Sequence, residues 1–337
     1  MKQFSWKTIV RRSSALLMVG VLVFASWYGW GVYRNLARIT GNNNPLQLVG
    51  AFTPADLEQT NGRTTILLAG YSKDDAGHSG AELTDSIMVI SVNQTDKSVT
   101  VLSIPRDLYV NIDGYGYSKI NAAYVYGEQS DFSEAGYADG GMGLLEKTVE
   151  DSLGIDSNYQ ALINYTAFKD LVNAVGGVTV DIKSSNPKGF YDPNTNLKLS
   201  NGATRLDGQT ALNLARARGE GYGSYGFVQG DFTRTQNQQQ ILLALKAAAG
   251  SGLNLMKVTN IANAVGNNVK TDLELNEIKT LYMIMKEYDA GTIKTVTLND
   301  VGGKNLLMSY RTSTGQSALV PAAGIDDYSA IKAALSL

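Results

Sequence analysis

Two neighbouring β-patterned runs constrain the fold of this chain more than any other feature. They are Ser86–Val92 and Ser98–Ile104, both rich in β-branched residues and separated by a short polar turn. The pattern predicts an antiparallel hairpin. Asp85 stands immediately before the first run, and Arg106 comes just after the second. Because the free ends of an antiparallel hairpin lie side by side, we expect Asp85 and Arg106 to share one rim of the sheet.

The remaining apolar periodicity predicts a single large α/β domain over residues 63–337, with a mixed or antiparallel central sheet flanked by helices. Helical spacing predicts helices over 119–126, 140–153, 165–175, 207–214, 234–249, 256–265, 275–288 and 328–335. Further strands are expected over 65–69, 159–163, 178–182, 293–298 and 306–310, with a loop over 186–203. Residues 215–218 are also expected to be strand-like, because Arg216 and Arg218 share a face only in an extended strand.

Composition excludes several classes of function. The chain of 337 residues has 29 Lys and Arg against 31 Asp and Glu, so it lacks the basic excess of a typical nucleic-acid-binding protein. It has no cysteine and a single histidine, His78. Thiol nucleophiles, thiolate metal sites and histidine-rich metal sites are therefore excluded. Any catalysis must use carboxylates, arginine, lysine and hydroxyl groups.

The N-terminal region predicts a membrane anchor. Residues 14–33 carry no charge and end in a cluster of Trp and Tyr, as expected of a transmembrane helix with an aromatic belt. The larger cationic excess precedes this segment, which predicts a cytoplasmic tail over residues 1–13. Residues 34–62 are then an extracytoplasmic linker, and the domain from residue 63 lies outside the cell in a single-pass membrane protein. The alternative is a cleaved secretory signal, although the sequence shows no convincing cleavage site.

The stretch Leu206–Gln240 contains several side chains that can bind an anion. Arg216, Arg218 and Arg234 flank a Gly/Tyr-rich loop, and Asp231 and Gln238 lie close to them in sequence. Guanidinium groups brought together repel one another unless an anion lies among them, and phosphate fits their planar donors well. Arg234 and Gln238 are four residues apart, so on a helix they face the same way. The stretch therefore predicts a phosphate or pyrophosphate site.

Carboxylates near the expected rim add a second function to this site. Asp74 and Asp75 lie in a Gly- and Asp-rich loop after the first predicted strand, and Asp85 stands at the rim itself. Carboxylates among basic residues hold Mg²⁺ or another hard cation, or accept a proton from an attacking hydroxyl. Phosphoryl transfer needs this combination of basic side chains and carboxylates.

The same residues carry a resemblance to the LytR-CpsA-Psr family, which covers residues 63 to the end. The motifs that follow in the order of that family are Asp85-Ser-Ile-Met, Ser103-Ile-Pro-Arg-Asp107, Lys119-Ile-Asn-Ala-Ala-Tyr124, Gly176-Gly-Val-Thr-Val180, the block from Leu206 to Arg218, and Asp231-Phe-x-Arg234 with Gln238-Gln239. The predicted N-terminal anchor also matches.

The resemblance implies an extracytoplasmic phosphotransferase of cell-envelope assembly. It would move a glycopolymer, as a sugar phosphate, from a polyprenyl-pyrophosphate carrier to peptidoglycan, with the lipid tail in a hydrophobic tunnel. The residues that would bind the pyrophosphate are Arg106, Lys119, Arg216, Arg218, Arg234 and Gln238. Asp85 would help to hold Mg²⁺ (or Mn²⁺), with Asp74 or Asp75 as further ligands, and Asp231 would orient arginines or assist proton transfer. Asp85, Arg106 and Asp231 would be the catalytic residues.

The chain departs from the family pattern at three positions. Ser72 stands where an Asp is common, Leu83 where an Arg is common, and Asn237 where an Arg often precedes the glutamine pair. These departures leave a second hypothesis open, a non-catalytic, membrane-anchored protein that binds polyprenyl-phosphate-linked or wall glycans.

Overall fold

The computed structural model describes residue 34 and residues 55–72, 83–227, 230–250, 268–288, 293–298, 301 and 303–335. The predicted transmembrane segment, the loop with Asp74, Asp75 and His78, and the predicted helix 256–265 lie outside these residues. Within the stretches that the structure describes, no helix combines the length and the hydropathy that a bilayer crossing needs.

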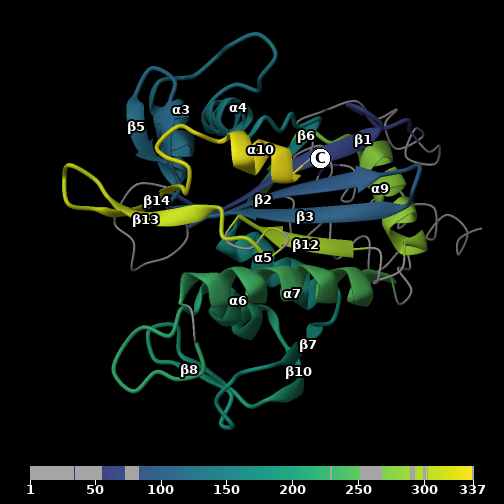
Figure 1. Ribbon diagram of the computed structural model, residues 1–337. Helices are drawn as coiled ribbons and strands as arrows, with labels where there is room; N and C mark the ends of the chain where they lie inside the picture. The colour runs from purple at the N-terminus through teal and green to yellow at the C-terminus, as the bar shows by residue number, and fades with distance from the viewer. Residues whose placement is uncertain are drawn as a thin grey trace, which may run out of the picture.

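A mixed six-stranded sheet forms the centre of the molecule (Figure 1). Its strands lie in the order β11 (Val269–Thr271), β6 (Tyr159–Asn164), β1 (Arg63–Tyr71), β2 (Thr84–Asn93), β3 (Ser98–Ile104) and β12 (Ile293–Thr297). The pairs β1–β2, β2–β3 and β6–β11 are antiparallel, whereas β1–β6 and β3–β12 are parallel. The predicted hairpin and the predicted α/β class with a mixed central sheet are confirmed.

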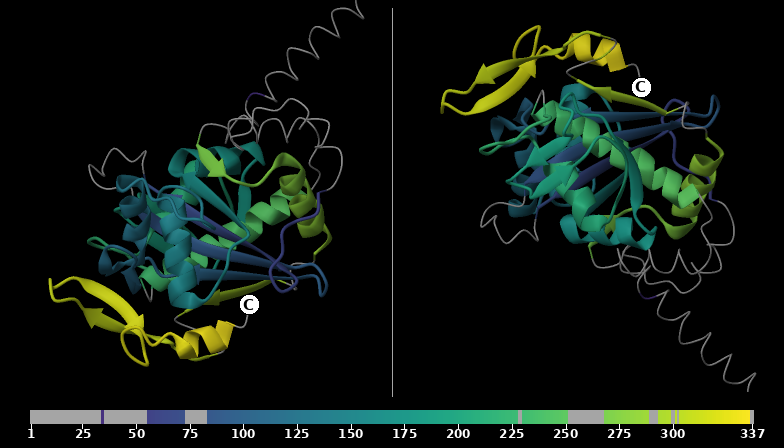
Figure 2. Two further views of the ribbon diagram at one scale, coloured as in Figure 1. Left: turned by 90° about the horizontal axis from the view of Figure 1, so that it is seen from above. Right: turned by 90° about the horizontal axis from the view of Figure 1, so that it is seen from below.

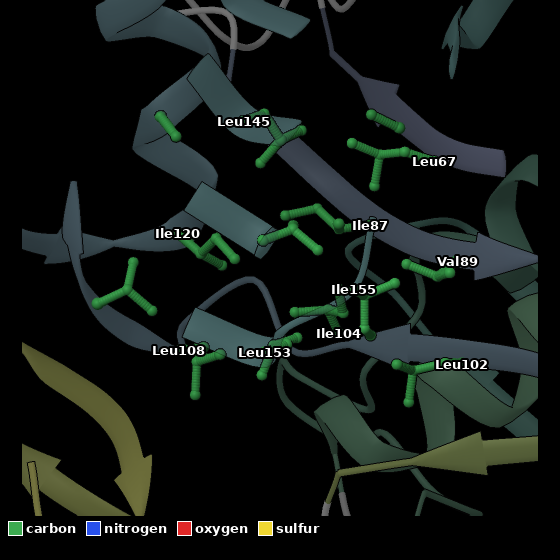
Figure 3. Packing of buried hydrophobic residues seen from close by; sticks show 14 of the residues in the cluster. Leu67, Ile87, Val89, Leu102, Ile104, Leu108, Ile120, Leu145, Leu153 and Ile155 are labelled. Atoms are coloured by element: carbon green, nitrogen blue, oxygen red, sulfur yellow. The ribbon is translucent and has the colours of Figure 1, made fainter. Parts of the chain in front are cut away.

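One face of the sheet packs against α3 (Ala123–Gln129), α4 (Gly141–Leu153) and α10 (Ser329–Leu335). Leu67, Ile87 and Leu102 project from adjacent strands into this core, where Leu145 and Leu153 of α4 meet them (Figure 3). Side chains alternate between the faces of a strand, so the intervening residues belong to the opposite face.

The opposite face is covered by helices that are distant in sequence. These are α5 (Tyr165–Ala174), α7 (Asp231–Gly250) and α9 (Leu275–Glu287), and Figure 1 shows α5 and α7 beneath the sheet. Met88 and Val101 point to this side and pack with Leu242 of α7 and Ile284 of α9.

A second, smaller core lies beyond α5 and α7 (Figure 1). It contains α6 (Gly208–Arg216) and two small antiparallel sheets. The sheets are formed by β7 (Val178–Ile182) with β10 (Gly202–Leu206), and by β8 (Phe190–Asp192) with β9 (Leu197–Leu199). This core fixes α6 against α7 and so positions the arginines that both helices carry.

Two further hairpins lie near the end of the sheet at which β3 finishes (Figure 1). They are β4 (Tyr109–Ile112) with β5 (Gly116–Lys119), and β13 (Leu307–Arg311) with β14 (Ser317–Pro321). A bridge between Leu108 and Leu319 joins them. Figure 2 shows β13, β14 and α10 along one side of the molecule.

The structure corrects three local predictions. Residues 215–218 are not a strand, because α6 continues to Arg216 and only then does Ala217 adopt an extended backbone (φ −65°, ψ 133°). The predicted helix 119–126 instead begins with a 3₁₀ turn at Ile120–Ala122, and Lys119 closes β5. The predicted loop 186–203 contains β8 and β9, whose alternating buried residues form part of the second core.

Candidate active site

The candidate site lies at the end of the sheet where β1, β3 and β6 finish and β2 begins. Gly70 of β1 pairs with Ser86 of β2 and with Ile163 of β6, so these three positions lie side by side. Asn164 then caps α5 by accepting a hydrogen bond from the backbone N–H of Ala167 at 2.8 Å. The strand ends therefore form one rim on which polar side chains converge.

Asp85 and Arg106 meet on this rim, as the hairpin pattern predicted. Arg106 Nη1 donates a hydrogen bond to Asp85 Oδ1, and both side chains are one-fifth exposed. Partial exposure leaves the pair accessible to a ligand, and the low exposure strengthens its electrostatic interactions relative to those in water.

A cavity of about 470 Å³ opens beside this pair. Its polar lining residues are Asp85, Arg106, Asp192, Arg216, Arg218, Glu220, Arg234 and Gln238. Its other walls are apolar and include Leu68, Met88, Phe168, Leu171, Leu212, Leu242 and Leu245. We call this space the main cavity. It matches an amphipathic ligand with an anionic head and an apolar chain.

The arginines reach the main cavity from three different elements. Arg216 is the last residue of α6, and its guanidinium lies over the ring of Tyr165 at 4.7 Å, a cation–π contact that holds it in place. Arg218 follows in the loop, and its Nη1 is 3.7 Å from Glu220 Oε1. Arg234 lies in the first turn of α7 and is only 4% exposed. Guanidinium groups that enter from several sides can surround a phosphate.

Asp192 organises the loop that carries Arg218, a role that the sequence did not reveal. The residue is 1% exposed. Its Oδ2 accepts hydrogen bonds from the backbone N–H groups of Arg218 and Gly219, both at 2.9 Å. Its Oδ1 accepts from those of Asn194 and Thr195 at 2.9 and 3.2 Å. The sequence Asp192-Pro-Asn is typical of an ordinary turn, so only the fold connects it to the distant arginines.

Two consecutive glutamines connect α7 to its surroundings. Gln238 lines the main cavity, where its Nε2 donates to the carbonyl of Ala215 at 2.9 Å and its Oε1 accepts from Ser86 Oγ at 3.2 Å. Gln239 points to the sheet and donates to Ser103 Oγ at 2.9 Å and to the carbonyl of Val296 at 3.2 Å. Gln238 and Arg234 both face the main cavity, as their spacing predicted.

A second, almost wholly apolar cavity of about 400 Å³ extends the apolar end of the main cavity. The two share Leu171, Leu242 and Leu245 in their walls. The second cavity continues along the sheet past Ile90 and Val101. We call these adjoining apolar walls, between the sheet and its covering helices, the apolar path.

Some predicted site residues lie elsewhere. Lys119 does not line the main cavity, and its Nζ is 2.6 Å from Asp107 Oδ1 beside a different pocket. Asp231 begins α7, but its side chain is outside the described residues, as are Asp74 and Asp75. Among the described residues, no group of three or more His, Asp or Glu side chains forms a metal site. Asp85 is therefore the single predicted metal ligand whose position is known.

The sheet and the main cavity define an α/β protein in which arginines and apolar side chains line one cavity. A family model identifies the particular family: the LytR_cpsA_psr family matches residues 35–320, and the chain belongs to it.

Curated relatives include proteins with a named activity. The polyisoprenyl-teichoic acid–peptidoglycan teichoic acid transferase TagU of Oceanobacillus iheyensis is 32% identical over 238 residues, which are 71% of this chain and 66% of the relative. The protein of the same name from Enterococcus faecalis is 32% identical over 248 residues, which are 73% of each. The regulatory protein MsrR of Staphylococcus aureus is 30% identical over 263 residues, 77% of this chain and 71% of the relative.

Solved structures share the fold. B. subtilis TagT is 26% identical with a TM-score of 0.59, covering 84% of this chain and 95% of TagT. TagT bound to LIIa-WTA is 25% identical with a TM-score of 0.61, covering 84% and 94%. B. subtilis TagV is 25% identical with a TM-score of 0.60, covering 82% and 99%.

Proposed function

We propose that this chain is a phosphotransferase that moves a glycopolymer, as a sugar phosphate, from a polyprenyl-pyrophosphate carrier to peptidoglycan. The observation that carries the proposal is the main cavity, in which four arginines at one end meet an apolar path at the other. A pyrophosphate that joins a prenyl chain to a sugar has both chemistries. The activity named for the TagU relatives is a transfer of this kind.

In the proposed reaction, an acceptor hydroxyl attacks the phosphorus that bears the sugar. A new P–O bond forms, the bond from that phosphorus to the bridging oxygen breaks, and polyprenyl phosphate leaves with the electron pair. The hydroxyl proton goes to the departing monophosphate, whose second pKa is about 6. Arg106, Arg216, Arg218 and Arg234 stabilise the negative charge of the transferring group, with Gln238 beside them.

We further propose that Asp85 holds Mg²⁺ or Mn²⁺ together with the pyrophosphate oxygens. Proteins usually bind Mg²⁺ through one or two carboxylates plus substrate phosphates, so a single carboxylate at the phosphate end fits this pattern. Asp74 or Asp75 would supply a further ligand. When bound, the cation would neutralise charge on the phosphates. Replacement of Asp85 by Asn should weaken Mn²⁺ binding, measured by electron paramagnetic resonance with the pyrophosphate ligand present.

The proposed reaction belongs on the outer face of a membrane. Residues 1–13 would be cytoplasmic, residues 14–33 would be the single transmembrane helix, and residues 34–62 would connect it to the catalytic domain, residues 63–337. This arrangement is supported by the cationic excess before the apolar segment. A cysteine introduced at exposed Ser313 should react with a membrane-impermeant thiol reagent on intact cells.

The test of the activity uses the full chain in detergent with a polyprenyl-pyrophosphate glycan, Mg²⁺ and peptidoglycan. The expected products are polyprenyl phosphate and labelled peptidoglycan. Replacement of Arg106 by Ala should lower the rate by about a hundredfold or more, because one charge-stabilising donor is lost. Arg205→Ala is the matched control, since Arg205 is exposed and lies outside the main cavity. Full transfer by Arg106→Ala would exclude the proposed site.

The same assay distinguishes the proposed enzyme from a non-catalytic protein that only binds the lipid-linked or wall glycan. That alternative predicts tight binding of polyprenyl phosphate, retained in Asp85→Ala, without turnover by the wild type.

A further inference from the structure

A pocket of about 320 Å³ lies beside the main cavity and shares Arg106 with it. We call it the hairpin pocket, because the β13–β14 hairpin forms one wall. Its lining includes Arg106, Lys119, Phe232, Thr235, Ser309 and Ser317. They come from the end of β3, from β5, from the first turn of α7, and from the hairpin.

The charges of the hairpin pocket disfavour an anion. Asp107 also lines it, with its Oδ1 2.6 Å from Lys119 Nζ and its Oδ2 3.7 Å from Arg106 Nε. Arg106 also pairs with Asp85, so two carboxylates balance the two cations, and Asp107 would repel a phosphate placed beside it.

The rest of the lining points to a neutral polar ligand. Thr235, Ser309 and Ser317 present hydroxyl groups, which both donate and accept hydrogen bonds. Phe232 adds an aromatic surface. The apolar path that would suit a prenyl chain belongs to the other two cavities. Hydroxyl groups beside an aromatic ring match the chemistry of a sugar.

A row of three tyrosines lies on the two hairpins next to the pocket, and one of them, Tyr109, is the cross-strand partner of the pocket residue Lys119. In the β4–β5 register, Tyr109 lies opposite Lys119 and Tyr117 opposite Asn111, so these four residues share one face. The rings of Tyr109 and Tyr117 stack with centroids 5.7 Å apart, and the Tyr310 ring lies 5.5 Å from that of Tyr109. Tyr117 is 47% exposed. Aromatic faces with polar edges offer a surface on which sugar rings can pack.

We propose that the hairpin pocket and the tyrosine row bind a saccharide chain, and that this chain is the acceptor of the transfer. The identification of the acceptor rests on the proposed function, whereas saccharide binding does not. Arg106 belongs to both spaces, so a sugar in the hairpin pocket is next to the group that contacts the phosphate. Lys119, which lines the hairpin pocket, then positions the acceptor.

The test uses the full chain in detergent and two changes in this region. Ser309→Trp fills the pocket from an exposed strand position, and Tyr117→Ala removes an exposed ring. Ser313→Trp is the matched control, because Ser313 is exposed in the turn of the same hairpin and does not line the pocket. Tyr117→Phe keeps the ring and should restore binding.

Binding of a β-1,4-linked N-acetylglucosamine tetramer and of soluble peptidoglycan strands is measured by calorimetry without donor. Both changes should weaken it by about tenfold, a loss of about 1.4 kcal/mol. Binding of farnesyl pyrophosphate should stay within about twofold, well below that loss. In the transfer assay, the same variants should raise the KM for the acceptor.

Three results would overturn the inference: no saccharide binding by the wild type, equal weakening by Ser313→Trp, or a parallel loss of farnesyl pyrophosphate binding. Saccharide binding without transfer would instead reject the proposed function, but the hairpin pocket would still be assigned to a saccharide. Normal transfer by Ser309→Trp would reject the acceptor role and leave the proposed function intact.

Discussion

Single buried carboxylates set the local geometry of this domain. Asp192 accepts four backbone hydrogen bonds from two turns, and so ties the Arg218 loop to β8. Hydrogen bonds to an ionised group are shorter and stronger than those between neutral groups. The position of Arg218 therefore depends on Asp192.

Replacement of Asp192 by Asn should destabilise the domain by about 1.5–3 kcal/mol, because the new amide group faces backbone donors in place of an acceptor oxygen. Urea unfolding measures this loss. Asp181→Asn is the control, since Asp181 is exposed on β7, and it should stay within about 0.5 kcal/mol of the wild type. Equal effects of the two changes would show that the Asp192 bonds contribute nothing specific.

The buried carboxyl group of Glu146 should make the free energy of unfolding depend on pH. Burial on α4 raises the pKa of this carboxyl above its ordinary value, although Ser157 Oγ donates to it at 2.7 Å. The folded state therefore holds a proton that the unfolded state releases, so this group contributes stability below the unfolded pKa, about 4.3, and loses it as the pH rises through the folded pKa.

Glu146→Gln should remove this part of the pH dependence. The melting temperature of the variant, relative to that of the wild type, should rise as the pH increases from acidic to neutral. Glu287→Gln, the same change at an exposed residue of α9, is the control. Parallel pH profiles for Glu146→Gln and the wild type would contradict the prediction.

Residue-level prediction from the sequence succeeded where the chemistry was local to a strand end. Asp85 and Arg106 could be paired because the hairpin alone determines which ends meet. Asp192 could not be found, since its partners Arg218 and Gly219 are distant in sequence. Motif order alone groups Lys119 with the arginines, whereas the structure places it in the neighbouring pocket, paired with Asp107.

At the scale of elements, α7 is the helix that joins the parts of the site. Its first turn carries Arg234, and its next turn presents Gln238 to the main cavity and Gln239 to the sheet. Successive helical residues point in different directions, so neighbouring glutamines can serve two surfaces at once. The orientation of Arg234 thus depends on how firmly α7 is held against β3 and β12.

Gln239→Leu tests this attachment. The change leaves Ser103 Oγ and the carbonyl of Val296 without the amide donor. It should cost about 1–3 kcal/mol of unfolding free energy. Gln236→Leu makes the same substitution at an exposed position of α7 and should cost little. If chemical denaturation gives the two variants the same stability, Gln239 does not anchor the helix.

The elements that were predicted well have long, regular patterns. Helices α4, α5 and α9 and strands β2 and β3 lie close to their expected bounds, because their apolar spacing extends over several turns or pairs. Strands β8 and β9 have three residues each, too few for alternation to distinguish them from a loop. The spacing of Arg216 and Arg218 favours a strand, but burial of Leu214 and Ala215 extends α6 to Arg216.

At the scale of the whole molecule, the apolar path should limit the length of the prenyl chain that can bind. The main cavity and the second cavity meet at Leu171, Leu242 and Leu245, on α5 and α7. A short prenyl chain needs only the first space, whereas a long chain must pass this junction. The dependence of affinity on prenyl chain length should therefore be set by residues that are remote from the phosphate end.

Leu245→Trp should narrow the junction. Affinity for octaprenyl pyrophosphate is expected to fall about tenfold, or about 1.4 kcal/mol, while that for geranyl pyrophosphate changes little. Leu245→Met, which conserves volume, should leave both affinities close to those of the wild type. Competition against a fluorescent prenyl pyrophosphate measures each affinity. An equal loss for both ligands would show that the path does not discriminate by length.

The parallel pairing of β3 with β12 has a consequence for how the chain reaches its final state. Residues 98–104 are made early, but their partner at 293–297 is nearly two hundred positions later. Until that segment emerges, β3 presents an unsatisfied row of backbone groups, the kind of edge that pairs with other chains. Contacts so distant in sequence also slow folding. Nascent chains should therefore be prone to aggregation and proteolysis until residues 293–297 emerge, because β3 lacks this neighbour until then.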